Sequence, residues 1–159
     1  MTEAPFLTNI VRRSEIPFPA DMPMQTLVFT SQKGGSGKTT LCGQLAVQAQ
    51  EAGAGPVALI DTDPQGSLAD WWQARGDDAM TLVQPAVDCL ADALQELRAV
   101  GVKLVFIDTQ PTVTDKIRKI VGAADLVVIP TRPSPHDLRA VGPTLDLVEA
   151  CEKPMVFAI

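Results

Sequence analysis

A glycine-rich segment of the sequence has the residue types that bind phosphate groups. It reads GGSGKTT over residues 34–40 and directly follows an apolar run. Such glycines let the backbone curl and point N–H groups at phosphate oxygens, and the following helix adds its positive N-terminal end. Lys38 would neutralise phosphate charge, and the Thr39 hydroxyl would bind Mg²⁺. The alternative is a plain glycine turn between a strand and a helix. The residues expected to contact phosphate are Gly34, Gly35, Ser36, Gly37, Lys38, Thr39 and Thr40.

The segment departs from the common phosphate-loop pattern G-x-x-x-x-G-K-[ST] at one position. The pattern places its first glycine at position 32, where this sequence has Gln32. The next residue, Lys33, is a second cation close to the expected phosphate contacts. The lost glycine and the added lysine both need an explanation.

Acidic residues follow two other apolar runs. Asp108 comes directly after residues 104–107, where a carboxylate can hold the shell of a magnesium ion. Asp61 and Asp63 follow residues 57–60 within the sequence DTDPQG. The two carboxylates could serve a metal and a base only with a cation positioned nearby. An ordinary turn built on Asp, Pro and Gly is the alternative for this segment.

The apolar pattern predicts strands that alternate with helices. Strands are expected at residues 26–30, 57–60, 81–83, 103–107, 125–129 and 155–159. Helices are expected at residues 38–51, 67–73, 114–121 and 134–150, and a further helix carries the stripe Val87, Leu90, Leu94 and Leu97. In the first helix, Leu41, Leu45 and Ala49 are expected to share the apolar face.

This order of elements predicts an α/β fold with a mostly parallel, doubly wound sheet flanked by helices. Ligands bind such folds at the carboxyl ends of the strands. The glycine-rich segment, Asp61 and Asp108 each follow a predicted strand, so we expect all three at one edge of the sheet.

Length and composition indicate one soluble globular domain. The chain has 159 residues, of which 46% are hydrophobic and 20% are charged. Its net charge of −6 argues against a broad basic surface for nucleic acid. It has no apolar run near the ~20 residues that cross a membrane and no signal-peptide core, so we expect a cytoplasmic protein without membrane contact. Its three cysteines lack metal-ligand spacing and are expected to be free thiols.

The N-terminal residues differ from the rest of the chain. Residues 1–24 contain four prolines and no sustained periodicity, which predicts an extended or disordered arm. Residues 25–159 are the predicted folded domain.

Three segments together resemble the ParA/MinD group of ATPases. SQKGGSGKTT, IDTDPQGS and FIDTQP look like that group's deviant Walker A, switch and Walker B elements. The later segment TRPSPHDLRAVG is similar to the proline-containing segment of small plasmid-type ParA proteins. The resemblance covers residues 26–159 and implies a P-loop fold of the deviant Walker A type, with ATP and Mg²⁺ as cofactors. Gln110 departs from the family, which often has a proline there.

The resemblance also implies a role for each matching residue. Lys33 would reach across a nucleotide-sandwich dimer to the phosphates that the other subunit binds, as an arginine finger does. This role would explain both changes in the loop. Asp63 would position or activate the attacking water, so the catalytic residues are expected to be Lys33, Lys38 and Asp63. Thr39, Asp61 and Asp108 would form or support the metal site.

At the level of function, the resemblance implies an ATPase that dimerises on ATP and hydrolyses it slowly. Such a cycle would position a plasmid, a chromosome region or another cargo, with a ParB-like or cargo-adaptor partner and non-specific DNA of the nucleoid. Family members continue past the position of Ile159, so the chain is expected to be truncated at its C-terminal end. Two alternatives stay open: a metabolic ATP-dependent enzyme on the same scaffold, and a nucleotide-binding module that does not hydrolyse.

Overall fold

The computed structural model describes residues 19, 21–76 and 78–159. In this part of the chain six strands form one sheet in the order β3-β2-β4-β1-β5-β6, and all neighbouring strands are parallel. The strands are β1 Gln25–Phe29, β2 Val57–Asp61, β3 Thr81–Val83, β4 Leu104–Asp108, β5 Leu126–Pro130 and β6 Met155–Ala158. The predicted parallel sheet is confirmed.

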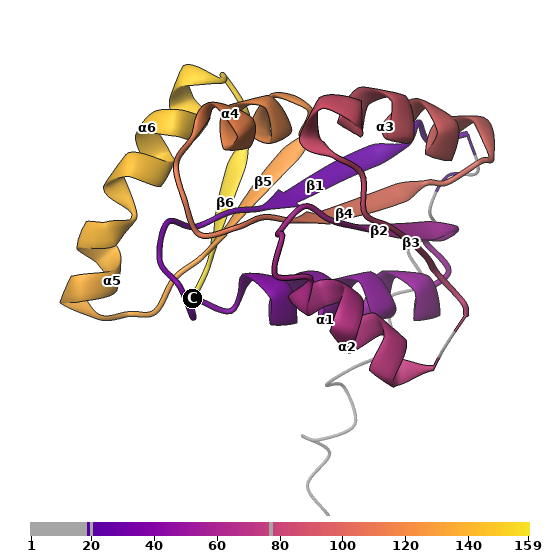
Figure 1. Cartoon of the computed structure of the whole chain (residues 1–159), viewed down its shortest axis with the longest axis horizontal. Coiled ribbons are helices and arrows are strands. Elements are labelled where there is room, and N and C mark those ends of the chain that lie inside the picture. The colour runs from indigo at the N-terminus through magenta and orange to yellow at the C-terminus, as the bar shows by residue number, and fades with distance from the viewer. Residues whose placement is uncertain (1–18, 20, 77) are drawn as a thin grey trace, which may run out of the picture.

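Helices cover both faces of this sheet. They are α1 Lys38–Glu51, α2 Ser67–Arg75, α3 Leu90–Ala99, α4 Asp115–Gly122, α5 Pro135–Ala140 and α6 Gly142–Ala150, with a 3₁₀ turn, Val87–Cys89, before α3. Figure 1 shows α1 and α2 on one face, and α3, α4 and α6 on the other. The fold is therefore the doubly wound α/β arrangement that the sequence predicts.

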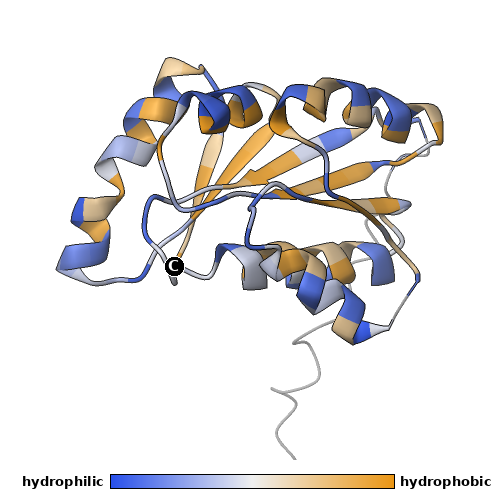
Figure 2. Cartoon of the chain, in the orientation of Figure 1, coloured by the Kyte–Doolittle hydropathy of each residue, from blue (hydrophilic) through white to orange (hydrophobic). Residues whose placement is uncertain are grey.

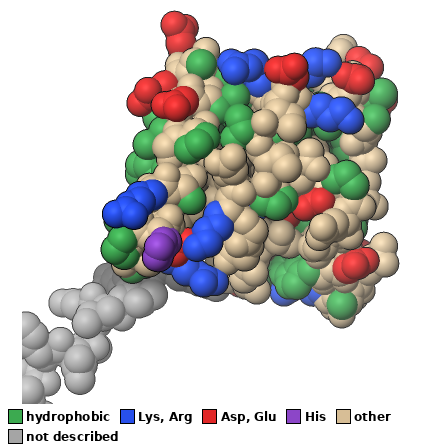
Figure 3. Space-filling view, turned by 60° about the vertical axis from the view of Figure 1, so that its left-hand side comes forward, with side chains coloured by type: hydrophobic (Ala, Val, Ile, Leu, Met, Phe, Trp, Pro, Cys, Tyr) green, Lys and Arg blue, Asp and Glu red, His purple; other side chains and the backbone are tan. Residues whose placement is uncertain are grey.

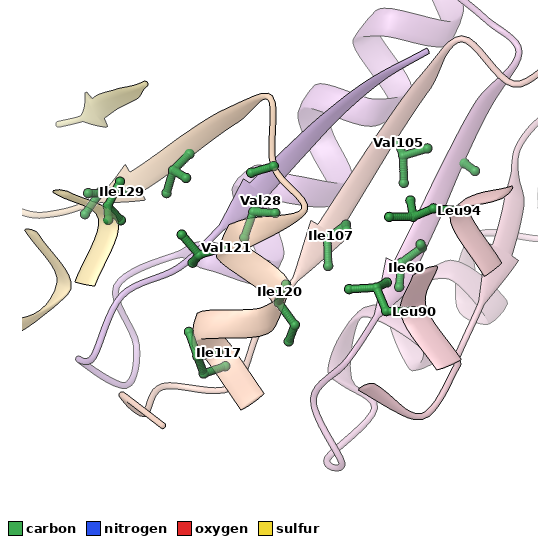
Figure 4. Close-up of a cluster of buried hydrophobic side chains, with 14 of the residues drawn as sticks. Val28, Ile60, Leu90, Leu94, Val105, Ile107, Ile117, Ile120, Val121 and Ile129 are labelled. Carbon is green, nitrogen blue, oxygen red and sulfur yellow. The ribbon is translucent and has the colours of Figure 1, made fainter. Parts of the chain in front are cut away.

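The central strands are apolar on both sides because both of their faces are covered. β4 is buried along its whole length. Its Val105 and Ile107 enter the core under α3 and α4, whereas Phe106 enters the core over α1 and α2. Figure 4 shows Val105 and Ile107 on the first of these sides, and Figure 2 shows the strands as the most apolar part of the chain. This burial holds the strand ends at fixed positions along one edge.

The buried face of α1 differs from the predicted one. Leu45 is 39% exposed, and Leu41 and Ala49 are only partly buried. The residues that pack inward are Cys42, Gly43, Ala46 and Val47. A Cβ atom on Gly43 would lie 2.8 Å from the Trp71 ring of α2. Because α1 lies close to its neighbours, small side chains form its buried face. The prediction from the sequence instead placed the leucines of α1 on that face.

The single helix predicted over residues 134–150 is also wrong, because the structure divides it in two. α5 ends at Ala140 and α6 begins at Gly142. Pro143 has no N–H group to continue the hydrogen-bond ladder of α5, and proline is favoured in the first turn of a new helix. A serine caps the start of α5, since Ser134 Oγ accepts a hydrogen bond from the Asp137 N–H at 3.1 Å.

Most of the predicted N-terminal arm, residues 1–18 and 20, lies outside the described residues, so the arm stays a prediction. Met24, at its boundary with the domain, is buried in the core under α3 and α4. None of the helices in the described ranges is long and apolar enough to span a membrane.

Candidate nucleotide-binding site

The polar segments singled out in the sequence meet at the carboxyl edge of the sheet. β4 lies between β1 and β2, and its last residue, Asp108, is in register with Phe29 of β1 and Asp61 of β2. The glycine-rich loop follows β1 directly and leads into α1. The structure thus brings residues more than 40 positions apart in the sequence, Asp61 and Asp108 among them, into one site.

The glycine-rich loop has the shape of a phosphate cradle. Gly35 and Gly37 have φ angles of +72° and +95°, which L side chains rarely adopt. A Cβ atom at Gly34, Gly35 or Gly37 would meet nothing within 4 Å, so open space lies beside all three glycines. Ser36 Oγ is buried and has no hydrogen-bond partner among the described residues. Gly37 is the N-cap residue of α1 and provides no side-chain hydrogen bond. The first N–H groups of the helix are therefore available to a bound anion.

Lys38 lies at the base of this cradle. It is 6% exposed, and its Nζ lies 3.5 Å from the Lys33 carbonyl oxygen. Burial lowers the pKa of Lys38, while the charges of Asp108 and Asp63 act in the opposite direction. A buried cation among backbone N–H groups is suited to bind a phosphate chain.

Asp108 and Thr39 form a pair beside Lys38. Thr39 Oγ1 donates a hydrogen bond to Asp108 Oδ2 at 2.6 Å, and the Thr109 N–H donates to Asp108 Oδ1 at 3.1 Å. Asp108 is fully buried, and this burial raises its pKa from 3.8 to about 6, with the hydrogen bond from Thr39 opposing the shift. A carboxylate whose charge is poorly compensated attracts a cation, and hydroxyl and carboxylate oxygens suit Mg²⁺.

The raised pKa predicts how stability depends on pH in the nucleotide-free and metal-free protein. Well below pH 4 Asp108 is protonated in both the folded and the unfolded chain. Between about pH 4 and 6 the unfolded chain loses this proton while the folded chain keeps it, so the free energy of unfolding falls over that range and the loss is complete above about pH 6. Asp108→Asn removes this charge and keeps both hydrogen bonds, since the amide can donate to Thr39. We expect the variant to be about 2–3 kcal/mol more stable than the wild type near pH 8, and equally stable near pH 4. Urea unfolding in a chelating buffer measures the difference, and a difference independent of pH would contradict this assignment.

Asp61 is bound mainly by backbone groups. It is 3% exposed, and its two oxygens accept hydrogen bonds from the N–H groups of Asp63, Leu68 and Ala69 at 3.0–3.1 Å. These bonds fix the loop after β2 and the first turn of α2. Within the described residues no group of three or more His, Cys, Asp and Glu side chains could hold a metal. A magnesium site here would thus be completed by phosphate oxygens and water.

These contacts predict a structural defect in Asp61→Ala. Three N–H groups, two of them buried, would lose their acceptor, so we expect the free energy of unfolding to fall by about 3 kcal/mol. The matched control is Asp70→Ala, an exposed acid in the first turn of α2, for which a loss below about 1 kcal/mol is expected. Urea unfolding without nucleotide measures both variants. Equal losses would show that Asp61 does not hold the loop.

Asp63 and Lys33 are less enclosed than Asp61 and Lys38. Asp63 is partly exposed, and its Oδ1 accepts a hydrogen bond from the Gln65 N–H at 3.0 Å. The Lys33 ammonium pairs with the Asp137 carboxylate of α5 in the same chain. This pair was not predicted from the sequence. Its only sign in the sequence is Lys33, which lies outside the common loop pattern, and the one acid of the segment TRPSPHDLRAVG.

One cavity lies beside the loop after β2, and another lies beside the glycine-rich loop. One has a volume of about 430 Å³, and its polar lining includes Asp61, Asp63, Gln84, Gln110 and Lys116. The other, of about 380 Å³, lies between the N-terminal end of α1 and the ends of β5 and β6, where it is lined by Ser36, Thr40, Leu41, Pro130 and Ile159, among others.

The glycine cradle before α1, the buried lysine and the Thr39–Asp108 pair define a phosphate-loop nucleotide-binding domain. Residues 27–145 match the model of the CobQ/CobB/MinD/ParA nucleotide-binding domain, and the chain belongs to that family. The resemblance to the ParA/MinD group is thereby confirmed.

Known proteins similar to this chain include partition and positioning proteins. A maintenance of carboxysome distribution protein A from Gloeobacter kilaueensis is 39% identical over 76% of this chain. A putative plasmid partition protein from Borrelia burgdorferi, solved with AMPPNP, superposes with a TM-score of 0.73 at 17% identity, over 85% of this chain and 75% of its own. A cobyrinic acid a,c-diamide synthase from Mycobacterium smegmatis, solved with ADP and magnesium, has a TM-score of 0.71 at 23% identity, over 84% and 72%. The matches span 55–63% of the length of the first three curated relatives.

Proposed function

We propose that this protein is a Mg²⁺-dependent ATPase that dimerises on ATP and positions a cargo in the cytoplasm. The observation that carries the proposal is the buried Lys38 and the Thr39–Asp108 pair at the base of an open glycine cradle. The relatives named for plasmid partition and carboxysome distribution support the positioning role.

The residues of the loop would bind the triphosphate. The N–H groups of residues 34–40 and the Ser36 hydroxyl would contact phosphate oxygens, with Lys38 neutralising their charge. Thr39 and Asp108 would hold Mg²⁺, which supplies charge stabilisation at the phosphates when bound. Asp61 would support this site by fixing the loop that follows β2.

Hydrolysis would depend on two further side chains. Asp63 lies on the same loop as Asp61 and is exposed enough to hold a water molecule for attack on the terminal phosphate. Lys33 would stabilise the charge that develops on the phosphates of a second copy, so the site would be complete only in a dimer. The binding free energy of ATP would shift the equilibrium from the monomer to the dimer, because ATP would bind the dimer more tightly.

The proposed partners are a second copy of the chain, a ParB-like or cargo-adaptor protein, and non-specific DNA. The net charge of −6 limits DNA contact to local basic groups such as Lys116, Arg118 and Lys119 on α4. Of these partners, the second copy of the chain matters most to the proposal, because Lys33 can act in trans only in a dimer.

The cavity beside Asp63 gives a specific reason to keep one alternative. Its volume of about 430 Å³ and its mixed polar and apolar lining could accept a small molecule, as a metabolic ATP-dependent enzyme on this scaffold would require. The structural similarity to cobyrinic acid a,c-diamide synthase is in keeping with that alternative.

Calorimetric titration with Mg²⁺-ATP and Mg²⁺-ADP, followed by phosphate-release assays, tests the proposal. We expect micromolar or tighter binding, and slow hydrolysis that rises more steeply than in proportion to protein concentration, because two copies form each active site. Hydrolysis strictly proportional to protein concentration over the whole range would favour the metabolic alternative. An absence of nucleotide binding would overturn both.

A further inference from the structure

The loop that carries Lys33 is fastened to the segment at residues 131–144 of its own chain. Three contacts join Gln32 to Thr144, Lys33 to Asp137, and Gly35 to Arg132. The first runs from a backbone N–H to a threonine hydroxyl at 3.3 Å, and the last from a guanidinium to a backbone carbonyl at 2.9 Å. The middle contact joins two charged side chains, so it is the one that a nearby charge can shift most.

Asp137 is placed to hold a cation. Its side chain is 8% exposed, whereas that of Lys33 is 42% exposed. One carboxylate oxygen is bound to Lys33, and the other accepts a hydrogen bond from Ser134 Oγ at 2.7 Å. The hydrogen bond from Lys33, followed by that from Ser134, holds the pKa of Asp137 below its ordinary value. Because a buried carboxylate is costly without a partner, Lys33 stays with Asp137 unless a stronger anion competes.

A lysine held in this way cannot at the same time contact phosphates in another subunit. We infer that the Lys33–Asp137 pair is an intramolecular latch, which keeps Lys33 in its own subunit until a triphosphate bound to a second copy draws it away. The inference rests on the proposed dimerising ATPase and adds a resting state to it. A triphosphate with its metal presents an additional phosphate to Lys33 that a diphosphate lacks, so the latch favours ATP over ADP as the ligand that releases it.

The surroundings provide a replacement for Lys33 after release. The charge of Arg132 contributes to the lowered pKa of Asp137, so this guanidinium could take the place of Lys33 beside the carboxylate. Figure 3 shows lysine and arginine side chains gathered around the histidine of α5, the helix that carries Asp137. A move of Arg132 to Asp137 would break its hydrogen bond to the Gly35 carbonyl. Release of the latch thereby frees the glycine loop as well.

The substitution Asp137→Asn tests the latch, because it removes the charge while the amide oxygen can still accept from Ser134. The measurement is the monomer–dimer midpoint by sedimentation in Mg²⁺ and the non-hydrolysable analogue AMPPNP. Each dimer breaks two latches, each worth roughly threefold, so the midpoint concentration should fall about tenfold. The matched control is Asp88→Asn, which breaks an exposed pair with Lys119 on α4 and should leave the midpoint unchanged.

A second readout needs neither nucleotide nor dimer. Amine labelling of the nucleotide-free protein, followed by mass spectrometry, should modify Lys33 several-fold faster in Asp137→Asn than in the wild type. An unchanged rate at Lys33, or an unchanged or higher midpoint while the wild type dimerises, would overturn the latch and leave the proposed function intact. If neither protein dimerises in AMPPNP but labelling rises, the pair exists, and the proposed dimer and its gating by the pair are both wrong.

Discussion

Replacing Lys38 by alanine is expected to abolish nucleotide binding. The lysine is the buried cation at the base of the glycine cradle, and its removal leaves the phosphate charge balanced only by backbone N–H groups. A loss of one charged contact of this kind is worth about 3 kcal/mol, so the dissociation constant for Mg²⁺-ATP should rise at least about 100-fold. The fold should be retained, because Lys38 is itself a buried charge whose removal relieves desolvation.

Calorimetry with Mg²⁺-ATP measures this loss, and Lys119→Ala is the matched control. Lys119 is an exposed lysine on α4 that pairs with Asp88. Its removal should change the dissociation constant by less than about twofold. Retention of tight binding by Lys38→Ala would show that the loop is a structural turn.

Replacing Lys33 by alanine is expected to separate binding from hydrolysis. Lys33 is half exposed and points to α5 of its own chain, so it contributes little to a nucleotide bound in its own subunit. In the proposed dimer it acts in trans, where such a cation contributes roughly 10³-fold to the rate. We expect ATP affinity within about threefold of the wild type and a loss of hydrolysis of roughly that size.

Phosphate release at saturating ATP, at high protein concentration and with DNA added, measures the effect on hydrolysis. Asp137→Asn is a useful companion, because it should ease dimerisation whereas Lys33→Ala should impair the dimer's chemistry. Normal hydrolysis by Lys33→Ala under these conditions would show that no lysine acts in trans.

Much of the fold can be predicted from the sequence because the strands are buried on both faces. Val57–Asp61 and Leu104–Asp108 have to be apolar almost throughout, and such runs stand out between helices. The predictions fail where the packing of neighbouring helices decides which side chains are buried or where a helix ends. Gly43 and its small neighbours form the buried face of α1, since the helix lies too close to Trp71 for large side chains. Pro143 marks the break between α5 and α6.

The candidate site is predictable where its residues are close in the sequence. The glycines, Lys38 and Thr39 form one continuous motif, and Asp108 follows an unmistakable strand. The position of Lys33 is not predictable in this way, because its partner Asp137 is 104 residues further along the chain. The backbone role of Asp61 likewise depends on where α2 begins relative to β2.

In the proposed dimer two copies enclose two triphosphates, and each copy provides Lys33 to the other. Light scattering coupled to size exclusion, on the full-length gene product, tests it most directly. With Mg²⁺-AMPPNP we expect twice the mass found without nucleotide, and with ADP we expect no change. A nucleotide-saturated protein that keeps its monomer mass in AMPPNP would rule out this dimer.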